Sequence, residues 1–464
     1  MWRSKKEKMN FDKLDMKKIT IILCMVLGLV SLNTFGQNEA TIERDIDLEK
    51  AITLGLANNK RLLIQAKETQ IADNNVYLGN AGLLPTVNLM GSGEYSNNEQ
   101  ELTIRTFQPD PPEITFDESG VESQNYAAVL QADYLLIGGF LGKYRYRILE
   151  NQSNLEQLKQ EAAINGTIVG ITELFTQIAG LQSREELLNV SFAVTRDRLK
   201  KIEDRKQFGQ ATGLDILRAQ TDLNEDLSTL DDVILAKTNL MKQLNLLIGL
   251  PLENRYRVNV NYALPETENA SEVIEVLKAN NPEIKLAEAG VTIAESQLGL
   301  VRSELYPKLN LFANYGYVYQ KNDIQQLAEL ENIGATIGAS LKFNIFNGNK
   351  TRKDIQNAKF NIESQELNKL DTEETITTAA LQELNSLKIL ENQLTREIAN
   401  LDTFQETFDR TRERYYNGQA TALDLRDTQT ALLNAKVQVS DIKLEIVESG
   451  VRLESLKGTL LMKN

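Results

Sequence analysis

Apolar residues follow two different periods along this chain, one typical of helices and the other of strands. Residues 47–81 carry apolar side chains near helical spacing, and Pro85 closes this segment because proline disfavours helix at the residue before it. Two runs within residues 86–137 instead alternate apolar and polar positions, which is typical of strands. The pattern predicts a helix followed by a β-hairpin over residues 86–137, with a long acidic loop between its strands at residues 96–124.

Two long stretches without proline predict two very long helices. They run from Lys143 to Gln207 and from Lys350 to Asn417. At a rise of about 1.5 Å per residue, each stretch predicts a rod roughly 100 Å long. A shorter helical stretch follows each of them, Leu214–Ile248 after the first and Ala422–Leu460 after the second.

A sharp reversal, or tip, separates each long helix from the shorter helix that follows it. Gly209 and Gly418 lie just past the long helices, where glycine suits the left-handed conformation that closes a helix. Thr212 and Thr421 are each followed three residues later by an aspartate, which is the pattern of a capping box that opens the next helix. The sequence therefore predicts two antiparallel helical hairpins, with tips at residues 207–213 and 417–422.

The two halves of the chain are copies of one plan. Four tip residues recur 209 positions later, as the pairs Gly209/Gly418, Thr212/Thr421, Asp215/Asp424 and Gln220/Gln429. Earlier in each half the offset is 222, because the first β-hairpin loop is thirteen residues longer. The predicted repeats are residues 37–268 and 269–464. Each holds a helix, a β-hairpin, a long helix, a tip and a shorter helix, and the first ends in an equatorial segment at 251–268.

The shorter helices suggest how the rods are arranged. Each is about half as long as a long helix, so two stacked end to end match one rod. We predict that Leu214–Ile248 and Ser271–Leu305 share one long helix, and that Ala422–Leu460 and residues 47–81 share the other.

The four predicted strands have one apolar side and one polar side. In the second β-hairpin, residues 308–346, the apolar side is rich in Tyr and Leu and extends to Phe343 and Ile345. Strands of about ten residues that are apolar outside and polar inside are typical of outer-membrane barrels. Four strands cannot close around water, but three chains would supply twelve. A soluble β-sandwich lid or a plain coiled-coil stalk remains an alternative at this point.

Composition fits a helix-rich body made of two similar halves. Charged residues make up 25% of the 464 residues and aromatic residues only 6%. Residues 1–36 have the basic start and short apolar run of a secretory signal, and translation could begin at Met16. The formal net charge of −14 becomes −18 once this segment is removed, because it carries seven Lys and Arg against three acids.

These numbers exclude several classes of function. A strongly acidic chain disfavours nucleic acid as a partner, since phosphate binding needs a basic face. The chain has no histidine, and its one cysteine, Cys24, lies within the signal. The sequence therefore predicts no soft-metal site, no cofactor and no catalytic residues, and a secreted hydrolase has no visible nucleophile and base.

The order and doubled spacing of these motifs resemble the TolC family of outer-membrane efflux proteins over residues 45–461. The resemblance implies a mainly α protein with a small β part that forms a homotrimer, with a twelve-stranded β-barrel in outer-membrane lipid and an α-helical barrel in the periplasm. It also implies docking to a periplasmic adaptor protein and to an inner-membrane pump of the RND or ABC type.

The resemblance also points to site residues at the tips. Asp424 and Asp427, one turn apart, match a periplasmic constriction, where three copies would place six carboxylates in one ring. Tyr415 and Asp215 match possible latch partners, while Ala420 stands where relatives have an arginine. The three aspartates could instead have purely structural roles in their own helices, because Asp215 and Asp424 can be helix caps and Asp427 can belong to a solvated face.

By the same resemblance, we expect the adaptor to contact the tips themselves, through Gly209, Thr212, Gly418 and Thr421. The sequence thus favours a passive exit duct of an efflux or type I secretion system in the outer membrane. The alternative from another class is a soluble periplasmic adaptor or scaffold built on coiled coils.

Overall fold

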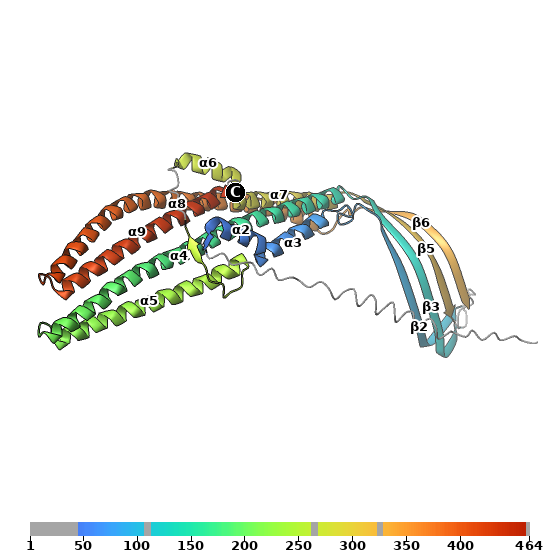
Figure 1. The fold of residues 1–464 in the computed structure, drawn as a ribbon. Helices are drawn as coiled ribbons and strands as arrows, with labels where there is room; N and C mark the ends of the chain where they lie inside the picture. Colours follow the sequence, from blue (N-terminus) through green and yellow to red (C-terminus); the bar gives the residue numbers. More distant parts are fainter. Residues whose placement is uncertain (1–44, 106–112, 261–267, 323–327, 461–464) are drawn as a thin grey trace, which may run out of the picture. The chain divides into compact units, whose positions relative to one another are not determined.

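The computed structural model describes residues 45–105, 113–260, 268–322 and 328–460. Within these residues the chain is mainly α-helical with one four-stranded sheet, which confirms the fold class predicted from the sequence (Figure 1). The predicted signal segment, the prolines of the first hairpin loop and part of the equatorial segment lie outside the described residues.

Four helices form two antiparallel hairpins. The long helices α4 (Leu141–Gln207) and α8 (Lys350–Tyr416) each have 67 residues. The shorter helices α5 (Gly213–Ile248) and α9 (Ala422–Lys457) each have 36 residues and return along them (Figure 1). Helix α4 also contacts α9, so the two hairpins lie against each other.

The helix predicted over residues 47–81 is instead two helices, α2 (Leu48–Asn58) and α3 (Lys60–Asn75). The break occurs at Asn59, whose side-chain oxygen accepts hydrogen bonds from the N–H groups at the start of α3. An asparagine in this position stops one helix and caps the next. The Asn59 amide also donates to the carbonyl of Leu247, at the end of α5, at 3.0 Å.

The second half breaks at the equivalent place. Helices α6 (Ala270–Asn280) and α7 (Pro282–Arg302) meet at Asn281, and the single helix predicted for Ser271–Leu305 is wrong. Asn281 donates to the carbonyl of Leu456, near the end of α9, at 2.8 Å. A short 3₁₀ turn, η1 (Ser303–Leu305), follows α7.

The arrangement of the shorter helices agrees with the prediction in part. Helices α5 and α7 both pack on α4, as predicted, and α7 packs on α8 as well. Helices α2 and α3 differ from the prediction, because they pack on α4 instead of sharing α8 with α9, and Thr69 of α3 donates to the carbonyl of Glu156 at 3.3 Å. Helix α6 packs on α8 and α9. The asparagine bonds explain the position of α3, because Asn59 fixes its start to α5 within the same half, as Asn281 fixes the start of α7 to α9.

Two equivalent apolar cores hold the middle of the helical part. Phe175 is fully buried in the first core and its repeat equivalent, Leu384, is buried in the second. The first core is covered by a parallel pair of short strands, β1 (Asp45–Asp47) and β4 (Arg257–Asn259), which contribute Ile46 and Val258. The sequence did not predict this pairing, since three residues give too little pattern to detect.

The sheet has the order β2-β3-β5-β6, and all neighbours are antiparallel. Its strands are β2 (Thr86–Arg105), β3 (Glu113–Ile137), β5 (Lys308–Asn322) and β6 (Glu329–Lys342). Most of the loop predicted at residues 96–124 is therefore strand. The alternation of apolar and polar residues stops near Tyr95, whereas the backbone hydrogen bonding between β2 and β3 continues through polar residues.

Strand β6 ends earlier than predicted, at Lys342, so Phe343 and Ile345 lie beyond its end. One face of the sheet exposes large apolar side chains, among them Leu89 and Ile337, which are 78% and 85% exposed. Within the described ranges, no helix is both long and apolar enough to cross a membrane.

Candidate functional site

The two tips have the same backbone geometry. Gly209 and Gly418 adopt the left-handed conformation, with φ of 72° and 74°, that most side chains avoid. After each glycine the chain turns back, and the N–H of the next residue, Gln210 or Gln419, donates to a carbonyl of the last helical turn. These bonds satisfy carbonyls that the helix end leaves free.

Both shorter helices begin with a complete capping box. The Asp424 carboxylate accepts hydrogen bonds from the N–H and the hydroxyl of Thr421, both at 2.8 Å, and Asp215 is bonded to Thr212 in the same way. These bonds, from the backbone first, lower the pKa of Asp215 and of Asp424 below the ordinary value. Both carboxylates are therefore ionised at neutral pH and occupied with holding the tip.

The predicted constriction residues differ in their surroundings. Asp424 is exposed but engaged in its capping box, whereas Asp427, one turn along α9, is exposed and outside it. The predicted adaptor contacts Gly209, Thr212, Gly418 and Thr421 are also exposed at the tips.

Tyr415 and Asp215, the predicted latch partners, are not brought together within the described part of this chain. Asp215 bonds to its own tip, and Tyr415 is only 1% exposed. The Tyr415 ring lies 5.2 Å from the guanidinium carbon of Arg205, which donates to the Tyr415 carbonyl at 3.3 Å. Burial raises the pKa of Tyr415, while the charges of Arg205 and Arg198 oppose the rise. Tyr415 is thus a contact between α4 and the second tip.

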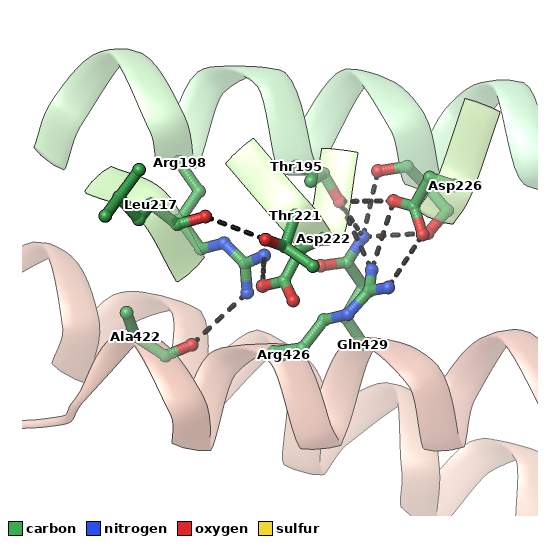
Figure 2. A network of polar contacts seen from close by, with 10 residues as sticks. Thr195, Arg198, Leu217, Thr221, Asp222, Asp226, Ala422, Arg426 and Gln429 are labelled. Atoms are coloured by element: carbon green, nitrogen blue, oxygen red, sulfur yellow. Dashed lines mark hydrogen bonds and ion pairs between the residues drawn. The ribbon is translucent and has the colours of Figure 1, made fainter. Parts of the chain in front are cut away.

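A polar network close to the tips ties the two hairpins together (Figure 2). Arg426 of α9 binds Asp226 of α5 with two parallel hydrogen bonds of 2.7 and 3.1 Å. Thr195 of α4 donates to the same carboxylate at 2.7 Å. Burial alone would lower the pKa of Arg426, but the hydrogen bond and charge of Asp226 raise it overall. A bidentate pair of this kind fixes distance and orientation together.

Gln429 and Arg198 extend this network in both directions. Gln429 donates to the hydroxyl and the carbonyl of Ser191 at 2.7 and 2.8 Å. Arg198, buried on α4, forms an ion pair with Asp222 and donates to the carbonyl of Ala422 at 3.3 Å (Figure 2). Burial lowers the pKa of Arg198, although Asp222 opposes this effect. Two arginines thus face two aspartates, and the buried charges balance.

No motif in the sequence predicts this network, although the repeat contains a signal for it. At the offset of 209, the second half has Ala431 and Ala435 where the first has Asp222 and Asp226, and the first half has Leu217 where the second has Arg426. Polar residues that replace apolar ones in one copy alone mark places where the halves meet each other. Comparing the copies residue by residue would have singled them out.

Ala420 packs beside the apolar cluster of Phe408, Tyr415 and Leu425. Its small side chain therefore supports the tip by packing. No group of three or more potential metal-ligating side chains occurs among the described residues.

Comparison with known proteins assigns the family. The sequence profile of the family described as "Outer membrane efflux protein" matches residues 51–250 and 273–459. The pyoverdine export outer membrane protein OpmQ of Pseudomonas aeruginosa is 24% identical over 421 residues, which cover 89% of this chain and 85% of OpmQ.

A further curated relative and a solved structure are also similar to this chain. The alkaline protease secretion protein AprF of Pseudomonas aeruginosa is 22% identical, over 88% of this chain and 83% of AprF. The structure of the CmeC outer membrane channel of Campylobacter jejuni superposes with a TM-score of 0.72 at 19% identity, over 89% of this chain and 85% of CmeC. The predicted resemblance and the predicted location, the outer membrane with an extension into the periplasm, are confirmed. The chain belongs to the outer membrane efflux protein family.

Proposed function

We propose that this chain is the passive exit duct of a tripartite efflux or type I secretion system. Three copies form a twelve-stranded barrel in the outer membrane and a helical tunnel below it. A periplasmic adaptor docks at the tips, and an inner-membrane pump of the RND or ABC type supplies the energy. One relative is named for pyoverdine export and another for alkaline protease secretion, which supports a duct whose cargo is chosen by its partners.

The observation that carries this proposal is the pair of open edges on the sheet. Strands β2 and β6 are its outer strands and have no further partner among the described residues. Their lengths, 20 and 14 residues, leave many backbone N–H and C=O groups to be paired. In lipid such edges disappear only when a barrel closes, and neighbouring copies provide that closure. A soluble adaptor or scaffold would leave both the edges and the exposed apolar face without a purpose.

The closed state is held chiefly by the network of Arg426, Asp226 and Arg198. It joins the hairpin α8–α9 to the hairpin α4–α5 within one chain. It supplies the cross-link that Ala420 cannot provide.

Purified full-length protein should run as a trimer and form discrete channels in a planar lipid bilayer. The reason is that closure of the barrel requires all three copies. Light scattering gives the mass of the detergent-solubilised particle, and single-channel recording gives the conductance. A monomer that stays soluble without detergent and does not conduct would contradict the proposal.

Asp427 should govern ion selectivity more than Asp424 does. We expect Asp427→Asn to lower the cation-to-anion permeability ratio roughly threefold, because three carboxylates leave the constriction. Asp424→Asn should act less on selectivity, since that carboxylate is held by Thr421. Reversal potentials in a salt gradient measure both variants. Equal cation-to-anion permeability ratios in wild type and Asp427→Asn would show that Asp427 does not govern ion selectivity.

A further inference from the structure

Cations gather where the strands pass into the long helices. Six of them lie within the first seven residues of α4 and the first four of α8, and we call this set the collar: Lys143, Arg145, Arg147, Lys350, Arg352 and Lys353. All six are exposed. The whole chain carries a formal charge of −14, so this concentration of positive charge runs against its composition.

The collar also violates a rule of helix stability. The N-terminal end of a helix carries partial positive charge and is stabilised by acidic residues or caps. Helices α4 and α8 have no acidic residue in the first turn and no side-chain cap, whereas α5 and α9 have full capping boxes. Lys143 and Arg352 occupy equivalent positions in the two halves. Unfavourable local charge in both copies indicates a function outside the helix itself.

Ion pairs within the chain do not neutralise most of the collar's positive charge. Lys350 pairs with Asp354 at 2.8 Å. Among the described residues, no ion pair within 4 Å involves Lys143, Arg147, Arg352 or Lys353. Lys353 donates only to the neutral Gln356, at 3.5 Å. Arg145 also has no such pair among the described residues, so five positive charges of the collar are available to an outside partner.

An exposed apolar belt lies directly beside the collar in the sequence. It consists of six residues at the strand ends and in the loops that lead to α4 and α8: Leu136, Ile137, Phe140, Phe343, Ile345 and Phe346. Their exposed fractions run from 49% for Leu136 to 88% for Ile345. The belt continues the apolar face of the sheet past the last paired residue of β6. Contiguous exposed apolar side chains mark contact with another protein or with a membrane, and this belt borders a sheet that the proposed function places in lipid.

Phe140 adds an independent sign that the exposure of the belt serves a function. It adopts φ +66°, a left-handed conformation that is unusual for a bulky residue. Its repeat equivalent, Asn349, has φ +63°, and asparagine tolerates that conformation well. The first half therefore keeps a strained phenylalanine, 66% exposed, where asparagine would suit the backbone better.

We propose that belt and collar together bind anionic phospholipids of the leaflet facing the helices. The belt contacts the glycerol and upper acyl chains, and the collar's ammonium and guanidinium groups bind the lipid phosphates. This inference rests on the proposed function, because it requires the sheet to lie in a bilayer. Apolar surface followed at once by basic residues is the arrangement that recognises anionic headgroups. A zwitterionic lipid offers the same chains but no net charge.

The test uses the full-length trimer in neutral detergent and phosphatidylglycerol labelled on an acyl chain. Fluorescence anisotropy follows binding, with unlabelled phosphatidylglycerol, phosphatidylcholine and inorganic phosphate as competitors. We expect phosphatidylglycerol to compete roughly tenfold better than phosphatidylcholine, and the difference to shrink as ionic strength rises. Inorganic phosphate should displace almost none of the lipid. Displacement by phosphate alone, or equal competition by both lipids, would overturn the proposal.

A charge-matched pair of variants separates the collar from general electrostatics. The collar variant carries Lys143→Gln, Arg147→Gln, Arg352→Gln and Lys353→Gln. The control carries the same changes at Arg196, Lys200, Lys388 and Arg396, exposed on α4 and α8 far along the chain from the belt. We expect the collar variant to bind phosphatidylglycerol about tenfold more weakly and the control within about twofold of wild type. An equal loss of phosphatidylglycerol binding in both variants would assign the effect to net charge and refute the lipid-binding role of the collar.

Trimer mass and conductance are measured on the same samples. A conducting trimer with no preference for phosphatidylglycerol refutes the collar and leaves the exit duct intact. A particle that neither trimerises nor conducts refutes the exit duct, and the lipid inference with it. Because the collar variant retains every strand residue, it should still form conducting trimers.

Discussion

Arg426→Met should open the periplasmic end and destabilise the helical hairpins. It removes the partner of Asp226, whose side chain is only 10% exposed, and leaves that carboxylate with Thr195 alone. Breaking a buried ion pair on one side costs about 3 kcal/mol. Methionine keeps roughly the aliphatic part of the arginine side chain and removes the guanidinium, so the loss is mainly electrostatic. We expect single-channel conductance to rise severalfold and the thermal midpoint of the helical part to fall.

Arg410→Met is the matched control for this variant. Arg410 pairs with Glu406 one turn away on α8, but their side chains are 75% and 63% exposed. Such a pair contributes less than about 1 kcal/mol, so conductance and midpoint should hardly change. The double variant Arg426→Met, Asp226→Leu should regain stability, because it removes the uncompensated charge. If Arg426→Met conducts like wild type, the network does not hold the tip closed.

Phe175→Ala should produce the largest loss of stability among single substitutions in the first core. Phe175 is fully buried, between α2, α5 and the β1–β4 pair. Truncating a buried phenylalanine to alanine costs about 3–5 kcal/mol through lost transfer energy and the cavity left behind. Circular dichroism of the trimer during heating would record the lower midpoint of helix loss.

Phe360→Ala provides the comparison on α8. Its side chain is 55% exposed, and the same truncation there should shift the midpoint by at most a small fraction of that change. A Phe175→Ala midpoint equal to that of Phe360→Ala would mean that the first core does not limit unfolding. Leu384→Ala, at the repeat equivalent of Phe175, should resemble Phe175→Ala.

The helical plan could be predicted because its signals are local and occur twice. Gly209 and Thr212 define a tip within a few residues, and Gly418 and Thr421 repeat it. The breaks at Asn59 and Asn281 were missed because the apolar spacing continues across them. Each asparagine caps the helix that follows it and is held in place by a bond to the carbonyl of a residue remote in sequence, neither of which periodicity records.

The contacts between the hairpins could not be predicted from spacing. Arg426 and Asp226 are 200 positions apart, and neither belongs to a recognisable motif. These two residues interact because α9 packs against α4 and α5. That contact depends on sequence differences between the two copies of the repeat. The roles of Asp424, Asp427, Tyr415 and Asp215 stay predictions, since they concern the space between copies of the chain.

The two β-hairpins differ in height. Strand β3 pairs with β5 only from Ser123 to Ile137, while its earlier residues pair with β2 alone. The upper part of β2–β3 is thus a two-stranded ribbon that rises above β5–β6. In the trimer that we propose, the outer rim has three raised two-stranded ribbons separated by three lower segments. Antibodies, bacteriophages or proteases arriving from outside the cell would meet these ribbons first, and sequence variation in the ribbons would leave the channel below unchanged.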